Sequence, residues 1–213
     1  SLLGPSQYRF MKSEDRIEGY ATHAGTLEYV ANSVKEGMPS DHFRFFNNLY
    51  FSSIGMGTYL GQTTNIDDKD MENAVYDSIK SGTINVIDTA INYRAMKSEK
   101  SIGRALARLI KEGIVSRDRI FICTKNGYVT NDGDYPSIDF REYINRMYIS
   151  PGIIELNDIS SGYHILNPAY IARCIDKSLC NLGVNTLDLV YIHNAYESWF
   201  NDVSRDKFME MLL

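Results

Sequence analysis

The sequence has few cysteines, few prolines and no excess of positive charge. Its 213 residues include 3 Cys, 5 Pro and 1 Trp, and 22 Lys and Arg stand against 27 Asp and Glu, which gives a formal net charge of −5. Because nucleic-acid-binding surfaces are normally basic, this balance argues against a nucleic-acid partner. No segment approaches the roughly 18 uninterrupted apolar residues of a membrane-spanning helix, and the N-terminus lacks a signal-peptide layout. We therefore expect a cytoplasmic protein without a membrane partner.

The cysteines and histidines indicate neither a disulfide framework nor a metal site. The cysteines are odd in number and fall in regular-looking segments, which favours buried thiols. The four histidines lie far apart, and none stands at metal-ligand spacing from a cysteine. We expect no metal. A composition of 44% hydrophobic and 23% charged residues is typical of a folded globular protein.

From residue 49 onward, short apolar runs alternate with amphipathic helical stretches. Strands are predicted at 49–57, 84–90, 118–127 and 186–194, and helices at 67–82, 98–113 and 168–183. Each helical stretch ends at a glycine, a common helix stop. Repeated strand and helix units joined by short links predict an α/β fold with parallel strands and helical crossovers.

The pattern divides the chain into a polar lead-in segment at 1–50 and a barrel-like domain at 51–213. The irregular stretch at about 126–167 exceeds the roughly 12 to 15 residues of an ordinary loop, so we expect an insertion with some structure of its own. A final helix is predicted, with Asp202 or Ser204 as its N-cap. A complete (β/α)8 TIM barrel takes about 250 residues. We expect here only about its first four βα units, with the chain cut within an element.

Four polar residues stand at or just beyond the ends of predicted strands. Asp88 and Lys125 close two of the strands, Tyr93 follows the first of these, and His193 closes the last. The carboxyl ends of parallel barrel strands converge on one face, where such folds place their active sites. Taken singly, these residues also have structural explanations. Asp88 could cap a helix, Lys125 could be a solvated lysine, and His193 could be a core histidine. Together they form a candidate cluster.

The cluster suits proton transfer to a carbonyl oxygen. A tyrosine hydroxyl ordinarily has a pKa of about 10, and a neighbouring ammonium favours its ionised form. Asp88 would hold that ammonium, and His193 would donate a hydrogen bond that polarises or orients the carbonyl. The accompanying hydride requires a nicotinamide cofactor.

Three segments that carry these residues resemble the aldo-keto reductase family. They are GTINVIDTAINYRAMKSEKSIG, IFICTK and LGVNTLDLVYIHN, and IGMGTYLG is similar to the family's first barrel strand. The resemblance covers roughly Phe51 to Asn194. It implies that Tyr93 is the general acid, that Lys125 and Asp88 tune it, and that His193 orients the substrate.

The same resemblance implies an NADPH cofactor and a small aldehyde or ketone substrate. Gly57, Thr58 and Tyr59, together with Asp88, would border the cofactor or substrate. The family's main contacts to the carboxamide, the pyrophosphate and the 2′-phosphate come from the second half of its barrel, which we expect to be absent from this sequence.

A short-chain dehydrogenase is a weaker alternative. Gly55, Gly57 and Gly61 form a glycine-rich segment, and Tyr93 with Lys97 forms a Y-x-x-x-K motif. A phosphate-binding glycine loop opens a helix directly, however, and here several residues intervene. We expect Lys97 to be a solvated charge near the start of a helix.

Two further side chains are expected to be structural. His164, within the insertion, could reach the substrate pocket, but a loop histidine is more often solvated. Cys123, two residues before Lys125, should point to the same side of its strand. We expect Cys123 to be a small packed residue rather than a nucleophile.

Two further functional hypotheses stay open. One is a non-catalytic cofactor-binding or interaction module, against which the retention of all four cluster residues speaks. The other is an inactive fragment that self-associates, because a half-barrel leaves two open strand edges.

Overall fold

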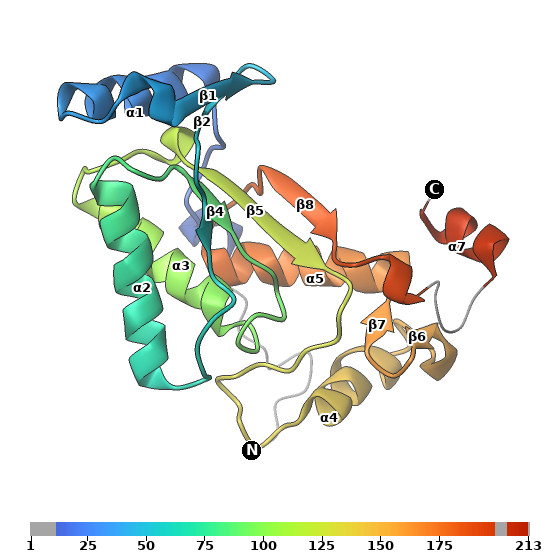
Figure 1. The fold of residues 1–213 in the computed structure, drawn as a ribbon. Helices are drawn as coiled ribbons and strands as arrows, with labels where there is room; N and C mark the ends of the chain where they lie inside the picture. The colour runs from blue at the N-terminus through green and yellow to red at the C-terminus, as the bar shows by residue number, and fades with distance from the viewer. Residues whose placement is uncertain (1–11, 199–203, 213) are drawn as a thin grey trace.

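A parallel sheet of four strands forms the centre of the structure, a computed structural model that describes residues 12–198 and 204–212. The strands lie in the order β3-β4-β5-β8, each parallel to its neighbour. Their bounds are β3 Met56–Gly57, β4 Val86–Asp88, β5 Phe121–Asn126 and β8 Leu189–Ile192. The connecting helices lie side by side along the sheet (Figure 1) and are α2 Asn65–Lys80, α3 Lys97–Lys111 and α5 Pro168–Leu182.

The sequence pattern locates these helices to within two residues at each end. The reasons are local. Thr64 caps α2 by accepting a hydrogen bond from the Asp67 amide, and Asn167 caps α5 ahead of Pro168. α5 ends at Gly183, whose φ of +65° is left-handed. The apolar side of α3 packs against the sheet, and its core residues are fully buried.

The predicted strand at 49–57 is wrong as a single strand. Its first half is β2 (Leu49–Ser52), which pairs antiparallel with β1 (Phe43–Phe46), and only β3 joins the parallel sheet. Asn47 and Asn48, with φ of 45° and 62°, form the tight turn that returns β2 along β1. Ser52 then bonds the carbonyl of Ile54, where the chain bends toward β3.

The lead-in segment carries a helix and a hairpin that cover the amino-terminal end of the sheet (Figure 1). α1 (His23–Lys35) and the β1-β2 hairpin pack there. The buried Tyr29 of α1 donates its hydroxyl proton to the carbonyl of Ile79 or Ile84, at 2.9 and 2.7 Å. Asn85, just before β4, accepts from the Ser52 amide. α1 and the β1-β2 hairpin therefore pack against the core of the sheet.

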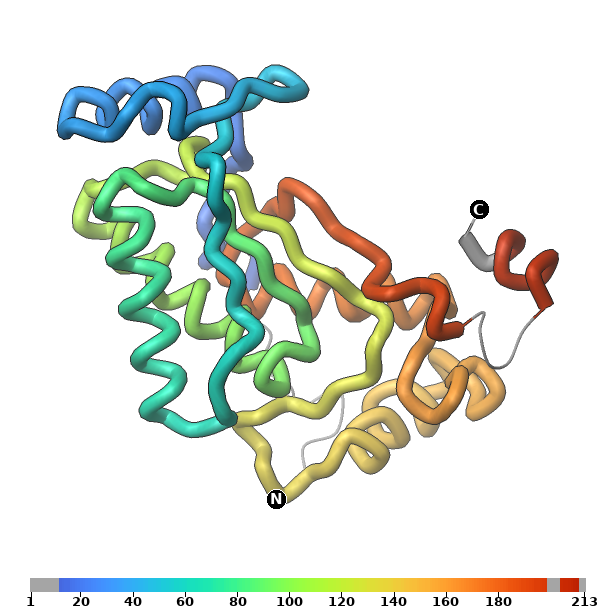
Figure 2. The backbone as a smooth tube through the Cα atoms, viewed as in Figure 1, coloured from blue at the N-terminus to red at the C-terminus, as the bar shows by residue number. Residues whose placement is uncertain are grey.

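The long segment after β5 has its own secondary structure and shares a second buried cluster with α5. It contains α4 Phe140–Ile144, a π-helical turn Asn145–Ile149, and the hairpin of β6 Ile159–Ser160 and β7 His164–Ile165. Tyr143, Tyr148 and Tyr170 are among the buried residues of this cluster. Figure 2 shows the segment, in yellow to orange, at the end of the sheet toward which the strands run.

The last described element is α7 (Arg205–Leu212). Ser204 accepts a hydrogen bond from the Lys207 amide at its start, as predicted for an N-cap. Asp202, the other predicted cap, lies outside the described residues.

A close approach of α3 to α5 generates a stability prediction. A Cβ added to Gly103 would lie 2.6 Å from the main-chain oxygen of Asn181 and 2.9 Å from that of Leu182. Replacing glycine by alanine inside a helix ordinarily stabilises it by about 1 kcal/mol. Here the crowding should reverse the sign, and we expect Gly103→Ala to lower the free energy of unfolding by about 1–3 kcal/mol. Urea unfolding measures it.

Ala107→Gly, at an exposed position one turn further along α3, calibrates the intrinsic helix preference in the same helix. A Gly103→Ala variant at least as stable as the parent would contradict the close packing of α3 on α5.

Candidate active site

Asp88, Lys125 and Tyr93 meet at the carboxyl end of the sheet. Asp88 is the last residue of β4, and Lys125 lies in the adjacent strand β5. The Lys125 ammonium is 2.8 Å from the Asp88 carboxylate and 3.2 Å from the Tyr93 hydroxyl. It also donates to the main-chain oxygen of Thr89, at 2.9 Å. Three of the predicted site residues therefore share one hydrogen-bonded group.

The surroundings of Lys125 keep its amine protonated. Burial alone would lower the pKa of Lys125, but hydrogen bonds to Asp88 and Tyr93 outweigh it and raise the pKa above its ordinary value. The amine carries its positive charge at neutral pH. The site thus presents a fixed cation beside the Tyr93 oxygen.

His193 joins this group from the far strand. It directly follows β8, and its amide donates to the Asn126 oxygen at 2.8 Å. The ring centroid of His193 lies 5.8 Å from that of Tyr93 and 4.8 Å from that of Tyr128, both edge-on. Burial, and then the charge of Lys125, lower the pKa of His193 to about 4. At neutral pH its ring is uncharged and offers a hydrogen bond rather than a charge.

The residues after β3 line the other side of the group. Gly57 pairs with Asp88 in the sheet, and a Cβ added to Gly57 would meet no atom within 4 Å. Thr58 is buried and donates its hydroxyl proton to the Asp88 carbonyl at 3.0 Å. Tyr59 is 67% exposed, and its ring centroid is 5.1 Å from that of Tyr93. The site is therefore open beside Gly57 and flanked by an aromatic ring.

A left-handed turn positions Tyr93. The three residues that follow it, Arg94, Ala95 and Met96, have φ of 51°, 51° and 70°. Such conformations cost about 1–3 kcal/mol each for non-glycine residues and persist only where the surroundings hold them. The Arg94 guanidinium is buried, donating to the Gln62 carbonyl at 2.8 Å and to Asp68 at 2.5 Å.

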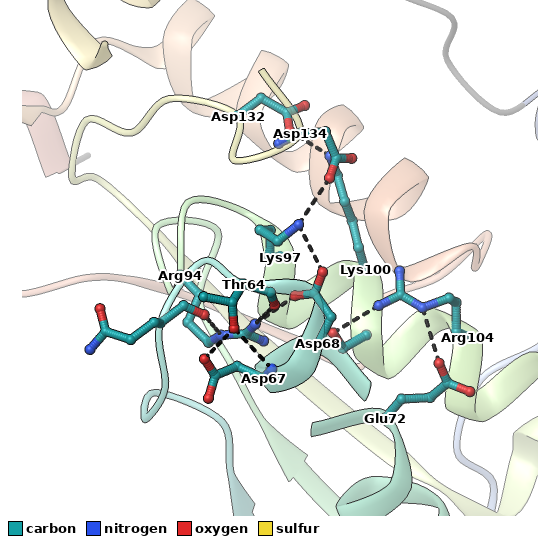
Figure 3. A network of polar contacts seen from close by, with 12 residues as sticks. Thr64, Asp67, Asp68, Glu72, Arg94, Lys97, Lys100, Arg104, Asp132 and Asp134 are labelled. Carbon is teal, nitrogen blue, oxygen red and sulfur yellow. Dashed lines mark hydrogen bonds and ion pairs between the residues drawn. The ribbon is translucent and has the colours of Figure 1, made fainter. Parts of the chain in front are cut away.

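The expectation for Lys97 is wrong: it is buried. Its ammonium forms ion pairs with Asp68, at 2.7 Å, and Asp134, at 3.3 Å (Figure 3). Lys100 pairs with Asp132 and Asp134, each at 2.5 Å, within the same network. The network ties the start of α3 to α2 and to the segment after β5. The left-handed turn also separates Tyr93 from Lys97, so the two do not share a helix as the alternative motif requires.

Cys123 behaves as predicted. Its side chain points to the same side as Lys125, with its sulfur 3.2 Å from the Asp88 carboxylate. Burial, and then the hydrogen bond to Asp88, raise the pKa of Cys123 to about 12. The thiol stays protonated and donates to Asp88. All three cysteines are free.

The expectation that His164 is solvated is also wrong. Its ring is fully buried and contacts the main-chain oxygen of His193 and the hydroxyl of Ser198, each at 2.7 Å. Tyr128, whose ring contacts that of His193, was not predicted from the sequence. For His164, the apolar neighbours in YHIL were a sequence signal of burial. For Tyr128 no such signal exists, because Gly127, with φ of +142°, interrupts the strand alternation just before it.

Neither a metal-binding cluster nor a membrane-spanning helix is seen in the described part of the chain. Over residues 12–198 and 204–212, no three His, Cys, Asp or Glu side chains are grouped so as to hold a metal ion. Nor is any helix there long and apolar enough to cross a membrane.

Fold and site together define a parallel α/β barrel segment whose carboxyl-end face carries an Asp, Tyr, Lys and His cluster. A family model, the aldo/keto reductase family, matches residues 53–212. The chain belongs to this family. Its fold class is confirmed as that of the family's (β/α)8 barrel, represented here by four βα units.

Individual relatives match part of their length. The NADPH-dependent aldose reductase of Saccharomyces cerevisiae is 26% identical over 147 residues, 69% of this chain and 32% of that protein. The 4-dihydromethyl-trisporate dehydrogenase of Mucor mucedo is 42% identical over 60 residues, 28% of this chain and 17% of that protein. The chain thus matches a third or less of the length of these curated relatives.

Solved structures that match part of the chain include a Bombyx mori aldo-keto reductase in complex with NADP. It is 24% identical with a TM-score of 0.45, over 71% of this chain and 37% of that one. An aldo/keto reductase from Klebsiella pneumoniae in complex with NADP and acetate is 21% identical with a TM-score of 0.43, over 70% and 38% of the two chains.

The electrostatics of His193 give a measurable prediction. Titration of the His193 ring by NMR should show a midpoint near pH 4. Lys125→Met should raise this pKa toward its ordinary value, because the nearby positive charge is then gone, while burial continues to lower it.

Lys111→Met, which removes an exposed lysine at the end of α3, should leave the midpoint unchanged. A midpoint near 6.5, the ordinary histidine value, would show that His193 is neither buried nor close to the Lys125 charge.

Proposed function

We propose that the protein reduces an aldehyde or ketone to an alcohol with NADPH. The observation that carries the proposal is the Lys125 ammonium, held 2.8 Å from the Asp88 carboxylate and 3.2 Å from the Tyr93 hydroxyl. Family membership supports the reaction class. The yeast relative is an NADPH-dependent aldose reductase, which supports the choice of NADPH over NADH.

The residues beside the cluster fit the nicotinamide end of this cofactor. The space beside Gly57 is open, and the Asp88 side chain is 40% exposed although it pairs with Lys125. Gly57, Thr58, Tyr59 and Asp88 would border the cofactor there. When bound, NADPH supplies the hydride that reduces the carbonyl carbon.

In the proposed mechanism, Tyr93 donates the proton. As the carbonyl carbon accepts a hydride, negative charge develops on its oxygen, and the Tyr93 hydroxyl gives that oxygen a proton. The phenolate left behind is stabilised by the Lys125 ammonium, which needs no reorganisation because Asp88 and the Thr89 carbonyl already hold it.

His193 orients the substrate in this scheme. Because its ring is neutral, it can donate a hydrogen bond to the carbonyl oxygen without competing with Tyr93 as the acid. Its ring lies beside that of Tyr93, so both groups would serve the same carbonyl oxygen.

A cytoplasmic location and self-association of the chain stay predictions. Two alternatives also stand: a module that binds cofactor without catalysis, and a chain that is inactive alone. The two experiments below separate them from the proposal.

Tyr93→Phe should reduce the rate of carbonyl reduction by about 10²- to 10⁴-fold, the usual contribution of a general acid. Lys125→Met should have an effect of similar size, since the phenolate then loses its cation. The measurement is the loss of NADPH absorbance with a panel of aldehydes and ketones. Lys111→Met serves as the matched lysine control and should leave the rate unchanged. Full activity in Tyr93→Phe would refute its role as the acid.

NADPH should bind saturably to the protein in a fluorescence titration, with Tyr93→Phe binding as the parent does because Tyr93 serves the proton rather than the cofactor. NADH titrated in parallel measures the coenzyme preference. Size-exclusion chromatography of the same sample reports self-association. Saturable binding without turnover of any carbonyl would favour the non-catalytic module, and no binding of either nucleotide would favour the inactive chain.

A further inference from the structure

His164 and the catalytic candidate His193 are joined by a direct contact from the insertion to the end of β8. His164 lies on β7, and its Nε2 atom is 2.7 Å from the main-chain oxygen of His193. Its Nδ1 atom is 2.7 Å from the Ser198 hydroxyl. Both His164 and Ser198 are fully buried.

The contact fixes the protonation of His164. A carbonyl oxygen can only accept, so Nε2 carries the proton and donates it to the His193 oxygen. Nδ1 of the neutral ring then accepts from the Ser198 hydroxyl. Burial, the largest influence, lowers the pKa of His164, in agreement with a neutral ring.

The main-chain oxygen of His193 has no hydrogen-bond donor from the described strands of the sheet, because strand pairing ends before it. β8 pairs with β5 only as far as Ile192, and the amide of His193 makes the last bond, to the Asn126 oxygen. Asn194 then turns away with φ of +48°. The peptide groups on either side of His193 are therefore held by Asn126 and by His164.

The His193 ring has no comparable anchor of its own. Its Nδ1 atom is buried and has no hydrogen-bond partner among the described residues. In most positioned histidines the second ring nitrogen is the one that is held. Here the ring direction depends on the main chain and on edge-on contacts with Tyr93 and Tyr128. The Tyr128 ring also lies 5.1 Å from that of His164.

The neighbouring backbone accommodates this approach. A Cβ added to Gly127 would lie 2.8 Å from the His164 Nε2 atom. Gly127 also has a φ of +142°, and its oxygen accepts from the Ile165 amide at 2.8 Å. A glycine therefore stands where the ring of His164 passes between the ends of β5 and β8.

We infer that His164 is a positioning residue, which holds His193 at the carbonyl-binding face by donating a hydrogen bond to its main-chain oxygen. The inference rests on the proposed function, in which His193 orients the substrate. It assigns to the segment after β5 a part in the chemistry of the site.

Two substitutions of His164 separate the two hydrogen bonds. His164→Gln can place an amide N–H near the position of Nε2 and so keep the donor to His193. His164→Asn reaches only the position of Nδ1 and loses that donor. We expect His164→Asn to lower kcat by about 10- to 100-fold through misplacement of His193, with the KM for NADPH unchanged. His164→Gln should recover most of the loss, and Ser198→Ala should have little effect.

A double-mutant cycle tests whether the effect passes through His193. In a His193→Ala background, His164→Asn should lower kcat no further. An equal fold-loss in both backgrounds would show a general structural role and overturn the inference. His164→Gln keeps a side chain of similar size and its donor at the same buried position, so recovery of kcat in that variant separates the lost hydrogen bond from a folding defect.

NMR of the His193 ring gives a readout independent of activity. Its signals should shift and broaden in His164→Asn but resemble the parent in His164→Gln. Unchanged His193 signals in His164→Asn would overturn the inference even if the protein is an active reductase. Shifted signals in a protein that reduces no carbonyl would uphold the positioning role and refute the proposed function instead.

Discussion

The ion pair between Lys125 and Asp88 is the interaction on which the site depends. Ion pairs with a partly exposed partner contribute little to stability, at most about 1 kcal/mol, and Asp88 is 40% exposed. Its importance is geometric. The ion pair holds the protonated amine of Lys125 at the carboxyl ends of β4 and β5, close to Tyr93. The parallel register of the two strands therefore sets the distance between Lys125 and Tyr93.

The placement of Tyr93 carries a conformational cost that other contacts offset. Three successive left-handed residues follow it, and none is a glycine. Arg94, inside that turn, is fixed by the Gln62 carbonyl and by Asp68, and Asp68 also binds Lys97 at the start of α3. Ser98 adds a hydrogen bond to the Thr58 carbonyl, at 2.7 Å. The network in Figure 3 therefore stabilises a strained loop.

Local signals in the sequence were enough to predict the parallel units and the cluster at their ends. Apolar runs and glycine stops mark the elements, and Asp88 and Lys125 stand where strands end. α1 was missed because its buried side includes Gly25, Thr26 and Ser33, which form no apolar stripe. The contacts made by Lys97 and His164 could not be predicted, because their partners come from segments distant in the sequence, such as Asp134 for Lys97 and Ser198 for His164.

The segment after β5 contacts the residues that hold Tyr93 on one side of the site and His193 on the other. At its start, Asp132 and Asp134 bind lysines of α3, the helix that follows the Tyr93 turn. At its end, His164 holds the main chain of His193. Because one segment contacts both sides, a displacement of it would change the distance between the proton donor and the group that orients the carbonyl. Substitutions in this segment can therefore change the rate of the proposed reaction without any of its residues touching the substrate. The sequence of the segment is thus more tightly constrained than that of a loop that only covers a site.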